Sequence, residues 1–218
     1  MIKISSRIQT IFSNIPNCEK FADVGCDHGY TSKLMLDSNK CSSVVYSDIS
    51  APSLKKAEQL LKDYKNAKAV CCNGLEKVDT DCDCVLISGM GGENIIQILQ
   101  EGFFPQRVVL QPMKNTDKLR KFLIQNSYMI ERDFIFKAED KFYNLIVAIR
   151  GVQELSAQQI SYGKDNLENP SEDFLEYLEI QLNKNKKILE GLVGEEREKL
   201  QEKISEEKAL YERLRVKR

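Results

Sequence analysis

The segment that most constrains the fold is the run Phe21–Tyr30, together with the acid at Asp48. A short β-type run ends in a turn that contains Gly25 and Gly29, and helical periodicity follows. Asp48 then ends the next apolar run, 23 residues after Gly25 (48 − 25 = 23). A strand, a glycine-containing turn, a helix and an acid form the nucleotide-binding arrangement of a βαβ unit. We therefore expect a parallel α/β sheet with a nucleotide-type ligand at the carboxyl ends of its strands.

Asp27, between the two glycines, limits which nucleotide the turn could hold. A dinucleotide-binding fingerprint has glycine at this position, so that the backbone can approach a pyrophosphate. A carboxylate there would repel the phosphates. An acid-rich loop instead suits a nucleoside ligand with positive charge, and S-adenosylmethionine carries an ammonium and a sulfonium group. The turn therefore favours a methyl donor over a nicotinamide cofactor.

Short apolar runs alternate with helical segments along the first two thirds of the chain. The expected parallel strands are 20–25, 43–47, 68–72, 83–88 and 106–110, and the expected helices are 2–14, 30–38, 51–65, 91–101 and 116–126. The adjacent β-type runs 128–136 and 142–150 predict an antiparallel hairpin. Five parallel strands followed by a hairpin are the chain order of a class I methyltransferase, whereas a nicotinamide-binding domain more often adds a sixth parallel strand. The predicted fold is therefore α/β, a Rossmann-like class I S-adenosylmethionine-dependent methyltransferase.

From about residue 155 onward the chain shows only helical periodicity. Apolar positions follow alternating steps of four and three residues in two segments, which predicts two helices folded into an antiparallel coiled-coil hairpin. The polar seam residues Asn185 and Glu207 predict a weak seam. We expect residues 1–153 to form the catalytic domain that binds the methyl donor, and residues 154–218 the helical coiled-coil domain. The hairpin could be a structural lid or dimer element, or an arm that grips RNA.

The composition argues against several classes of protein. No run approaches the ~20 apolar residues of a membrane span, and the first residues lack the apolar core of a signal peptide. We therefore expect a cytoplasmic protein with no membrane contact. The seven cysteines include no CxxC pair and the chain has one histidine, so free buried thiols fit better than a zinc site and no metal is expected. With a net charge of −1, any RNA-binding surface must be a local patch.

Candidate donor-binding residues follow the ends of four predicted strands, where parallel sheets place their ligands. Asp48 is expected to accept hydrogen bonds from both ribose hydroxyls, although an acid there could also cap the next helix. Asn73 could meet the adenine edge or form an ordinary turn with Gly74. The residues assigned to the donor site are Asp23, Gly25, Asp27, Asp48, Ile49, Asn73, Gly74, Gly89, Met90 and Gly91.

Two further features bear on the methyl acceptor. Glycines at 89, 91 and 92 would let the backbone approach a flat base closely. The Asp/Asn-Pro-Pro-Tyr/Phe sequence with which many enzymes hold an exocyclic amine is absent, so a ring nitrogen is a more natural acceptor. Cations after the fifth predicted strand could follow a phosphate backbone or form a solvated helix face. They are Lys114, Lys118, Arg120 and Lys121.

Four motifs, in this order and spacing, give the chain a specific resemblance. They are Asp-Val-Gly-Cys-Asp-His-Gly-Tyr (23–30), Asn-Gly-Leu (73–75), Gly-Met-Gly-Gly (89–92) and Leu-Gln-Pro (110–112). Over about residues 1–150 the chain resembles the bacterial tRNA (adenine(22)-N(1))-methyltransferases, the TrmK family. Family members usually have Ser and Ala where this chain has Cys26 and Gly29, and Gly-Glu where it has Ser47 and Asp48. Aspartate can still bind a ribose, so the chemistry of the site is kept.

The resemblance implies transfer of a methyl group from S-adenosylmethionine to N1 of adenine 22 in tRNA. N1 is already nucleophilic, so positioning and desolvation would supply most of the rate. We assign the catalytic roles to Asp27, His28 and Tyr30. Asp27 would stabilise the cationic product base, and His28 or Tyr30 would contact or stack on the target base. A monomer or a weak homodimer is expected.

Two other functions remain open from the residues themselves. A methyltransferase of the same fold could act on a protein or a small molecule. Alternatively, the chain could be a non-catalytic RNA-binding scaffold in which the helical hairpin is the working part. A measurement of donor binding would distinguish the scaffold from an enzyme. Mapping of the methylated product would distinguish a protein or small-molecule methyltransferase from a tRNA methyltransferase.

Overall fold

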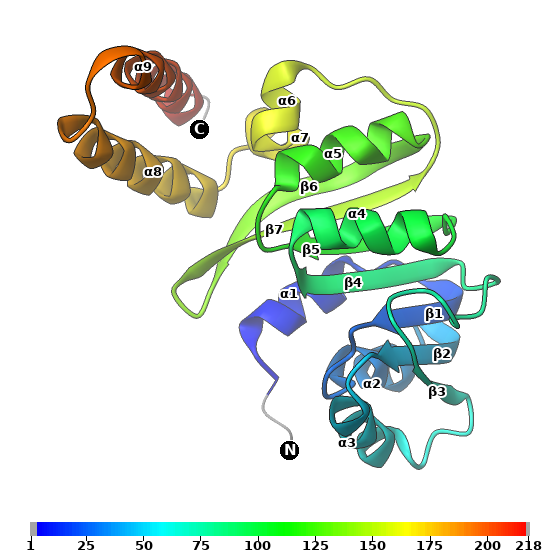
Figure 1. Ribbon diagram of the computed structural model, residues 1–218. Coiled ribbons are helices and arrows are strands. Elements are labelled where there is room, and N and C mark those ends of the chain that lie inside the picture. The colour runs from blue at the N-terminus through cyan, green and yellow to red at the C-terminus, as the bar shows by residue number, and fades with distance from the viewer. Residues whose placement is uncertain (1–3, 217–218) are drawn as a thin grey trace.

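A seven-stranded mixed sheet is the centre of the computed structural model, which describes residues 4–216 (Figure 1). Its strands are β1 (Cys18–Val24), β2 (Cys41–Asp48), β3 (Ala67–Cys71), β4 (Cys84–Met90), β5 (Arg107–Pro112), β6 (Tyr128–Ala138) and β7 (Lys141–Arg150). The strand order is β3-β2-β1-β4-β5-β7-β6. Strands β1 to β5 pair in parallel, whereas β7 is antiparallel to both β5 and β6. The predicted class I fold, with its terminal hairpin, is confirmed.

Helices cover both faces of the sheet (Figure 1). They are α1 (Ser6–Asn14), α2 (Tyr30–Asp37) and α3 (Ala51–Leu61) on one face, and α4 (Gly92–Glu101) and α5 (Thr116–Gln125) on the other. The helix predicted at 51–65 corresponds to α3, which ends earlier, at Leu61. The first helix begins at Ser6 rather than at residue 2, and residues 2 and 3 lie outside the described chain.

The two faces explain the strand pattern seen in the sequence. Phe21 of β1 packs in the core cluster under α1, α2 and α3, and the next residue, Ala22, packs in the cluster under α4 and α5. Successive strand residues point to opposite faces, so a sheet covered on both sides needs nearly continuous apolar runs. The carboxyl ends of β1, β2, β3 and β4 are left at one edge, where the sequence predicted a ligand.

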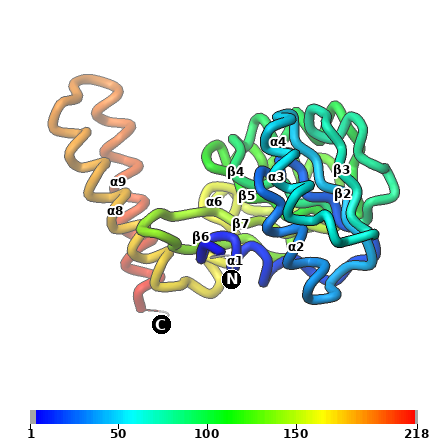
Figure 2. The backbone as a smooth tube through the Cα atoms, turned by 90° about the horizontal axis from the view of Figure 1, so that it is seen from below, coloured from blue at the N-terminus to red at the C-terminus, as the bar shows by residue number. Residues whose placement is uncertain are grey.

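The C-terminal part has two different regions. Helices α6 (Ala157–Tyr162) and α7 (Lys164–Glu168) pack on α5 and β6 of the sheet domain. Helices α8 (Glu172–Glu190) and α9 (Gly194–Val216) form a hairpin that projects from that domain (Figures 1 and 2). A small apolar cluster that includes Ile135 of β6 and Phe174 of α8 fixes the base of the hairpin. The predicted division after residue 153 stays a prediction.

The hairpin seam contains the predicted polar pair. Asn185 Nδ2 donates a hydrogen bond to Glu207 Oε2 at 2.8 Å, and Lys203 Nζ lies 3.8 Å from the other carboxylate oxygen of Glu207. Apolar residues such as Leu178 and Ile204 bury the rest of the seam. The two polar seam residues therefore pair with each other across the hairpin, and Lys203 approaches Glu207 from the exposed side.

Candidate donor cleft and active-site rim

A cleft of about 400 Å³ lies at the carboxyl ends of β1, β2 and β4, beside the turn after β3 and the helix α4. Seven of the predicted donor-site residues line it: Gly25, Asp48, Ile49, Asn73, Gly74, Gly89 and Met90. The acidic residues of the lining are Asp48 and Glu101. In the described chain the lining contains no lysine, arginine or histidine. The cleft thus presents acidic groups to a ligand, but they are Asp48 and Glu101 and not Asp27, the acid on which the sequence argument rested.

Asp48 lines the cleft, and two backbone amides hold its carboxylate. Its Oδ2 accepts a hydrogen bond from the backbone amide of Asp27 at 3.1 Å, and its Oδ1 accepts one from the amide of Ser50 at 2.8 Å. A carboxylate oxygen can accept more than one hydrogen bond, so both oxygens of Asp48 could also accept from ribose hydroxyls. The side-chain cap of α3 is Ser50, whose hydroxyl accepts from the amide of Ser53. This removes the alternative in which Asp48 is the cap.

The turn at Gly25 is shaped by close contacts. Gly25 has φ +70°, and a Cβ atom added there would lie 2.4 Å from Cε of Met90. A side chain at this position would therefore be strained and would also displace Met90 from the cleft wall. The absence of a side chain at Gly25 therefore lets Met90 pack directly against the turn between β1 and β4.

The lining of the cleft includes side chains that suit a flat base. Ile49 lines the cleft and is 71% exposed, which is high for a large apolar side chain. Ile98 on α4 lines it as well, together with the amide-bearing residues Asn73 and Gln97. The α4 residues Asn94, Gln97, Ile98 and Glu101 line the cleft but were not predicted from the sequence. The signal for Asn94, Gln97 and Glu101 was their polar character in a helix that begins within the Gly-Met-Gly-Gly motif.

Asp23 does not line the cleft. It is buried, and its Oδ2 accepts hydrogen bonds from the amide and hydroxyl of Ser32 at 3.2 and 2.8 Å. Burial raises the pKa of Asp23 from 3.8 to about 6, against the lowering effect of the Ser32 hydrogen bonds. In the described chain this residue fixes the start of α2 beneath the glycine turn, and a direct contact with the donor stays a prediction.

The predicted catalytic residues follow Gly25 in the same turn and at the start of α2, where Asp27 is exposed and His28 and Tyr30 are half-buried. Asp27 has φ +47°, and its carboxylate Oδ2 lies 3.7 Å from Nε2 of His28. The rings of His28 and Tyr30 are stacked, with centroids 5.4 Å apart and planes 2° from parallel. These three residues lie outside the cleft lining but follow Gly25 directly. The neighbouring thiol of Cys26 is a poor nucleophile, because burial and the nearby acids raise its pKa.

The Gly-Met-Gly-Gly motif divides into two parts. Gly89 and Met90 line the cleft, whereas Gly91 precedes α4 outside it. A Cβ atom on Gly92 would lie 2.5 Å from the carbonyl oxygen of Asn115, and the Gly92 amide donates to the carbonyl of Lys114 at 2.8 Å. Gly92 is thus needed for contact between two loops of the protein, not for the approach of a base.

The four predicted RNA-contacting cations do not form one surface. Lys114, Lys118 and Lys121 are exposed, and Lys118 Nζ lies 2.5 Å from Glu93 Oε1. Arg120 is 1% exposed, and its Nε and Nη2 donate to the two oxygens of Asp133 at 2.8 and 2.9 Å. The prediction of an RNA contact is wrong for Arg120, because its guanidinium is enclosed and holds α5 to β6.

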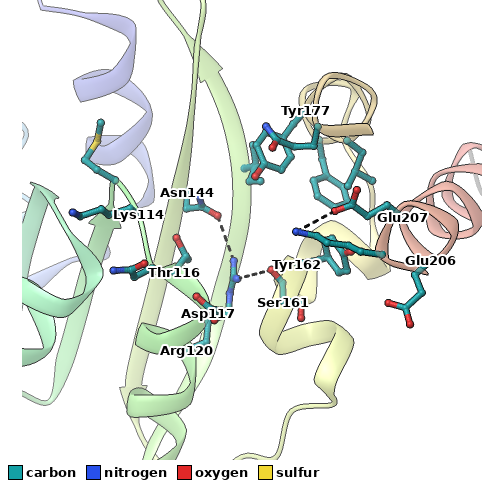
Figure 3. Close-up of a pocket in the computed structure, with 17 residues that line it drawn as sticks. Lys114, Thr116, Asp117, Arg120, Asn144, Ser161, Tyr162, Tyr177, Glu206 and Glu207 are labelled. Carbon is teal, nitrogen blue, oxygen red and sulfur yellow. Dashed lines mark hydrogen bonds and ion pairs between the residues drawn. The ribbon is translucent and has the colours of Figure 1, made fainter. Parts of the chain in front are cut away.

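The edge of the sheet at the carboxyl ends of its parallel strands is called the rim below. A second cavity, of about 550 Å³, lies between this rim and the helical hairpin (Figure 3). Lys114 and Asp117 come from the sheet domain on one side, and Tyr177 and Glu207 come from the hairpin on the other. Arg120 lies between them, and it donates hydrogen bonds to Asn144 and to the carbonyl of Ser161 (Figure 3). Charges of both signs line this cavity, so it does not resemble a simple anion groove.

The donor cleft fits S-adenosylmethionine in its chemistry. Asp48 matches a ribose, the apolar side chains of Ile49 and Ile98 match an adenine, and the acidic lining matches a cation. Within residues 4–216, no group of three or more His, Cys, Asp or Glu side chains is arranged to hold a metal ion. No helix of the described chain has the length and apolarity to cross a membrane.

Comparisons with known proteins agree with this geometry. A model of the methyltransferase domain family matches residues 4–146. A Mycoplasma pneumoniae protein, named provisionally as a tRNA methyltransferase, is 38% identical over 133 residues, 59% of this chain and 62% of that relative. The chain therefore spans under two thirds of that relative's length. The Bacillus subtilis tRNA (adenine(22)-N(1))-methyltransferase is 29% identical over 177 residues, 78% of this chain and 74% of the relative.

A solved structure extends the likeness to most of the fold. A Streptococcus pneumoniae protein in complex with S-adenosyl-L-methionine superposes with a TM-score of 0.88 and 25% identity. The superposition covers 96% of this chain and 100% of that one, so it includes the helical hairpin as well as the sheet domain.

Proposed function

We propose that this chain, which belongs to the methyltransferase domain family and within it to the TrmK-like tRNA methyltransferases, transfers a methyl group from S-adenosylmethionine to N1 of adenine 22 in tRNA. The observation that carries the proposal is the donor cleft. Asp48 and Gly25 line this cleft, and the Asp48 carboxylate accepts a hydrogen bond from the amide of Asp27, which begins the polar loop that continues with His28. A donor in the cleft would therefore meet an acceptor at this loop.

The cleft residues would bind and orient the donor. S-adenosylmethionine supplies an electrophilic methyl group on a sulfonium. Asp48 would hold the ribose hydroxyls, and the Ile49 and Ile98 side chains would pack against the adenine ring. Asn73 would offer its amide to the edge of that ring. The hydrogen bond from the Asp27 amide to Asp48 fixes the loop relative to the bound ribose.

The loop residues would position the acceptor. The lone pair of adenine N1 attacks the methyl carbon as the carbon–sulfur bond breaks, so the sulfur becomes a neutral thioether and the positive charge moves to the base. No proton is transferred in this step. The Asp27 carboxylate would stabilise the positive charge on the base, and the stacked pair of His28 and Tyr30 would offer a flat surface to it. Since N1 must be unpaired to react, the target base would leave its helix.

The choice of tRNA rests on the family and on the helical hairpin. The Bacillus subtilis relative is named for this reaction, and the hairpin gives the chain a second surface beyond the sheet domain. We infer that the hairpin lies against the body of the tRNA while the target base enters the rim. We also expect the protein to act in the cytoplasm, as a monomer or a weak homodimer.

The test is product mapping. Purified protein and S-adenosylmethionine are incubated with a tRNA transcript that has adenine at position 22 and with a matched transcript that has guanine there. Nucleoside mass spectrometry should find 1-methyladenosine in the first transcript only. Donor binding without a methylated tRNA would favour a protein or small-molecule acceptor. Absence of donor binding would leave the scaffold function.

A further inference from the structure

Arg7 on α1 brings a positive charge to the edge of the donor cleft. A Cβ atom added to Gly89 would lie 3.5 Å from Nη2 of Arg7, and Gly89 lines the cleft. The guanidinium carbon lies 5.4 Å from the centre of the Tyr143 ring on β7, which supports it from the other side. Arg7 therefore lies where α1 crosses the carboxyl ends of the central strands.

The guanidinium of Arg7 is not matched by an acid of its own. Its Nε is fully buried and has no hydrogen-bond partner in the described chain. Glu139 attracts Arg7, but the Glu139 carboxylate accepts hydrogen bonds from the amide and hydroxyl of Ser6 at 2.8 and 2.7 Å. Among residues 4–216, Arg7 makes no ion pair within 4.0 Å. A buried donor without a partner is costly, so an anion that reached this guanidinium would be bound favourably.

The donor carries an anion for which the cleft itself offers no cation. S-adenosylmethionine has an α-carboxylate on its amino-acid part, whereas the cleft lining in the described chain contains Asp48 and Glu101 and no basic side chain. Left without a counter-ion, that carboxylate would be repelled by the acids that favour the rest of the molecule. Arg7 is placed to supply the missing charge, and a guanidinium can bind a carboxylate with two parallel hydrogen bonds.

We propose that Arg7 binds the α-carboxylate of the methyl donor and thereby orients its amino-acid part against Gly89. The inference rests on the proposed donor cleft and adds to it a residue from outside the sheet. A phosphate of the bound tRNA is the other anion that could reach a guanidinium. The contact with a cleft-lining glycine favours the donor, and the test distinguishes the two.

The test uses two ligands that differ in the amino-acid part. S-adenosylhomocysteine carries the α-carboxylate, and 5′-methylthioadenosine carries the same nucleoside without it. Titration calorimetry is done with full-length wild type, Arg7→Met and the charge-preserving Arg7→Lys. Arg7→Met should weaken S-adenosylhomocysteine by about ten- to a hundredfold and leave 5′-methylthioadenosine unchanged, the range expected for a hydrogen bond between charged groups. Arg7→Lys should fall between wild type and Arg7→Met.

Two control variants are compared with Arg7→Met in the same titrations. Asp48→Asn should weaken both ligands, because both contain the ribose. Lys114→Met removes a cation near Gly91, on the other side of the same glycine motif, and should leave the affinity for S-adenosylhomocysteine unchanged.

The possible outcomes separate the alternatives. Equal losses for both ligands in Arg7→Met would mean that the substitution distorts the cleft, and the proposal would be overturned. An unchanged affinity for S-adenosylhomocysteine together with a raised KM for tRNA would assign Arg7 to a phosphate instead. Should Arg7→Met not fold, an unchanged S-adenosylhomocysteine affinity in Arg7→Lys overturns the proposal by itself. Failure of the wild type to bind either ligand would contradict the donor cleft, which is a different result from a failure seen only in the variants.

Discussion

At the scale of single residues, the carboxylates near the glycine turn have different environments and therefore different roles. Asp48 is held by two backbone amides at the cleft, Asp27 projects from the turn into solvent, and Asp23 is buried beneath it. We therefore assign ribose binding to Asp48 and charge stabilisation to Asp27, whereas Asp23 supports the start of α2. Their positions relative to the strand ends, rather than their chemistry, separate these roles.

Asp27→Asn tests the role of the exposed carboxylate. The substitution keeps the backbone amide that donates to Asp48 but removes the negative charge beside the product base. We expect the single-turnover methylation rate of tRNA to fall by about ten- to a hundredfold, since electrostatic groups at reacting centres contribute on this order. The control is Asp63→Asn, an exposed acid that follows α3, which should keep the wild-type rate. A normal rate and a normal donor affinity in Asp27→Asn would remove both assigned roles of Asp27.

The ionisation of Asp23 makes the free energy of unfolding depend on pH, and its raised pKa determines the sign of this dependence. Burial raises its folded-state pKa to about 6 from 3.8, so the folded protein holds this proton more tightly than the unfolded chain does. The free energy of unfolding should therefore decrease as the pH rises from about 4 to 6, by up to about 3 kcal/mol from this residue, and stay reduced above pH 6.

Asp23→Asn isolates this contribution, because asparagine does not ionise and can still accept from Ser32. Urea unfolding of the variant and the wild type is compared at several pH values between 4 and 7. The variant should gain stability relative to the wild type across this range. A constant difference between the two proteins would show that Asp23 does not titrate in it.

Sequence reasoning found the residues at strand ends and failed for two arginines. Gly25, Asp48 and Gly89 were predictable because parallel strands bring their carboxyl ends to one edge. Arg120 was assigned to the surface by its charge, although it follows Leu119 on the buried side of α5. Its partner Asp133 is 13 residues away on a strand, so no local pattern reveals the pair. Arg7 was missed because α1 precedes the first strand and reaches the cleft only through the fold.

At the scale of elements, a buried ion pair joins three secondary structures. Arg120 of α5 contacts Asp133 of β6 through two hydrogen bonds and donates to the carbonyls of Ile160 and Ser161 at the end of α6. The amide of Lys164, at the start of α7, donates to Asp133 as well. The pair therefore connects the sheet domain to the short helices that precede the hairpin.

Arg120→Met should destabilise the protein by about 3–5 kcal/mol, because Asp133 would remain buried without a counter-charge. The double variant Arg120→Met with Asp133→Leu should recover a large part of this loss, since it leaves no buried charge behind. Urea unfolding of the two variants and the wild type measures both effects. Equal stabilities for the single and double variants would mean that the loss comes from the α6 carbonyls rather than from the isolated carboxylate.

The elements themselves were largely predictable, and the exceptions have physical reasons. The central strands were predicted because both faces are buried, and the β6–β7 hairpin because its two strands are adjacent in the chain. Helices α6 and α7 were not separated from the hairpin, because short helices give too little periodicity to show which surface they pack on. Their attachment to α5 and β6 depends on Arg120 and Asp133.

At the scale of the whole molecule, the proposed substrate is a polyanion, whereas the protein has a net charge of −1. Binding then depends on where the few exposed cations lie. Lys114 borders the cavity between the rim and the hairpin. Lys121 is exposed on α5, the helix that begins shortly after Lys114. The arrangement suggests a tRNA path from the hairpin across α5 to the rim, with the target base entering beside the Asp27 loop.

Salt dependence tests this path. Each lysine that contacts a phosphate releases a counter-ion on binding, so Lys114→Ala and Lys121→Ala should each reduce the slope of log KM for tRNA against log salt by about 1. The control is Lys68→Ala, at the start of β3 near the opposite edge of the sheet, where Lys68 pairs with Asp79. That variant should keep the wild-type slope.

The affinity for S-adenosylhomocysteine should stay constant in all three variants, because none of these lysines lines the donor cleft. Unchanged slopes in both Lys114→Ala and Lys121→Ala would move the tRNA path away from α5. Of the proposed path, only the contact with the hairpin would then remain, where α9 has basic residues in its last turn.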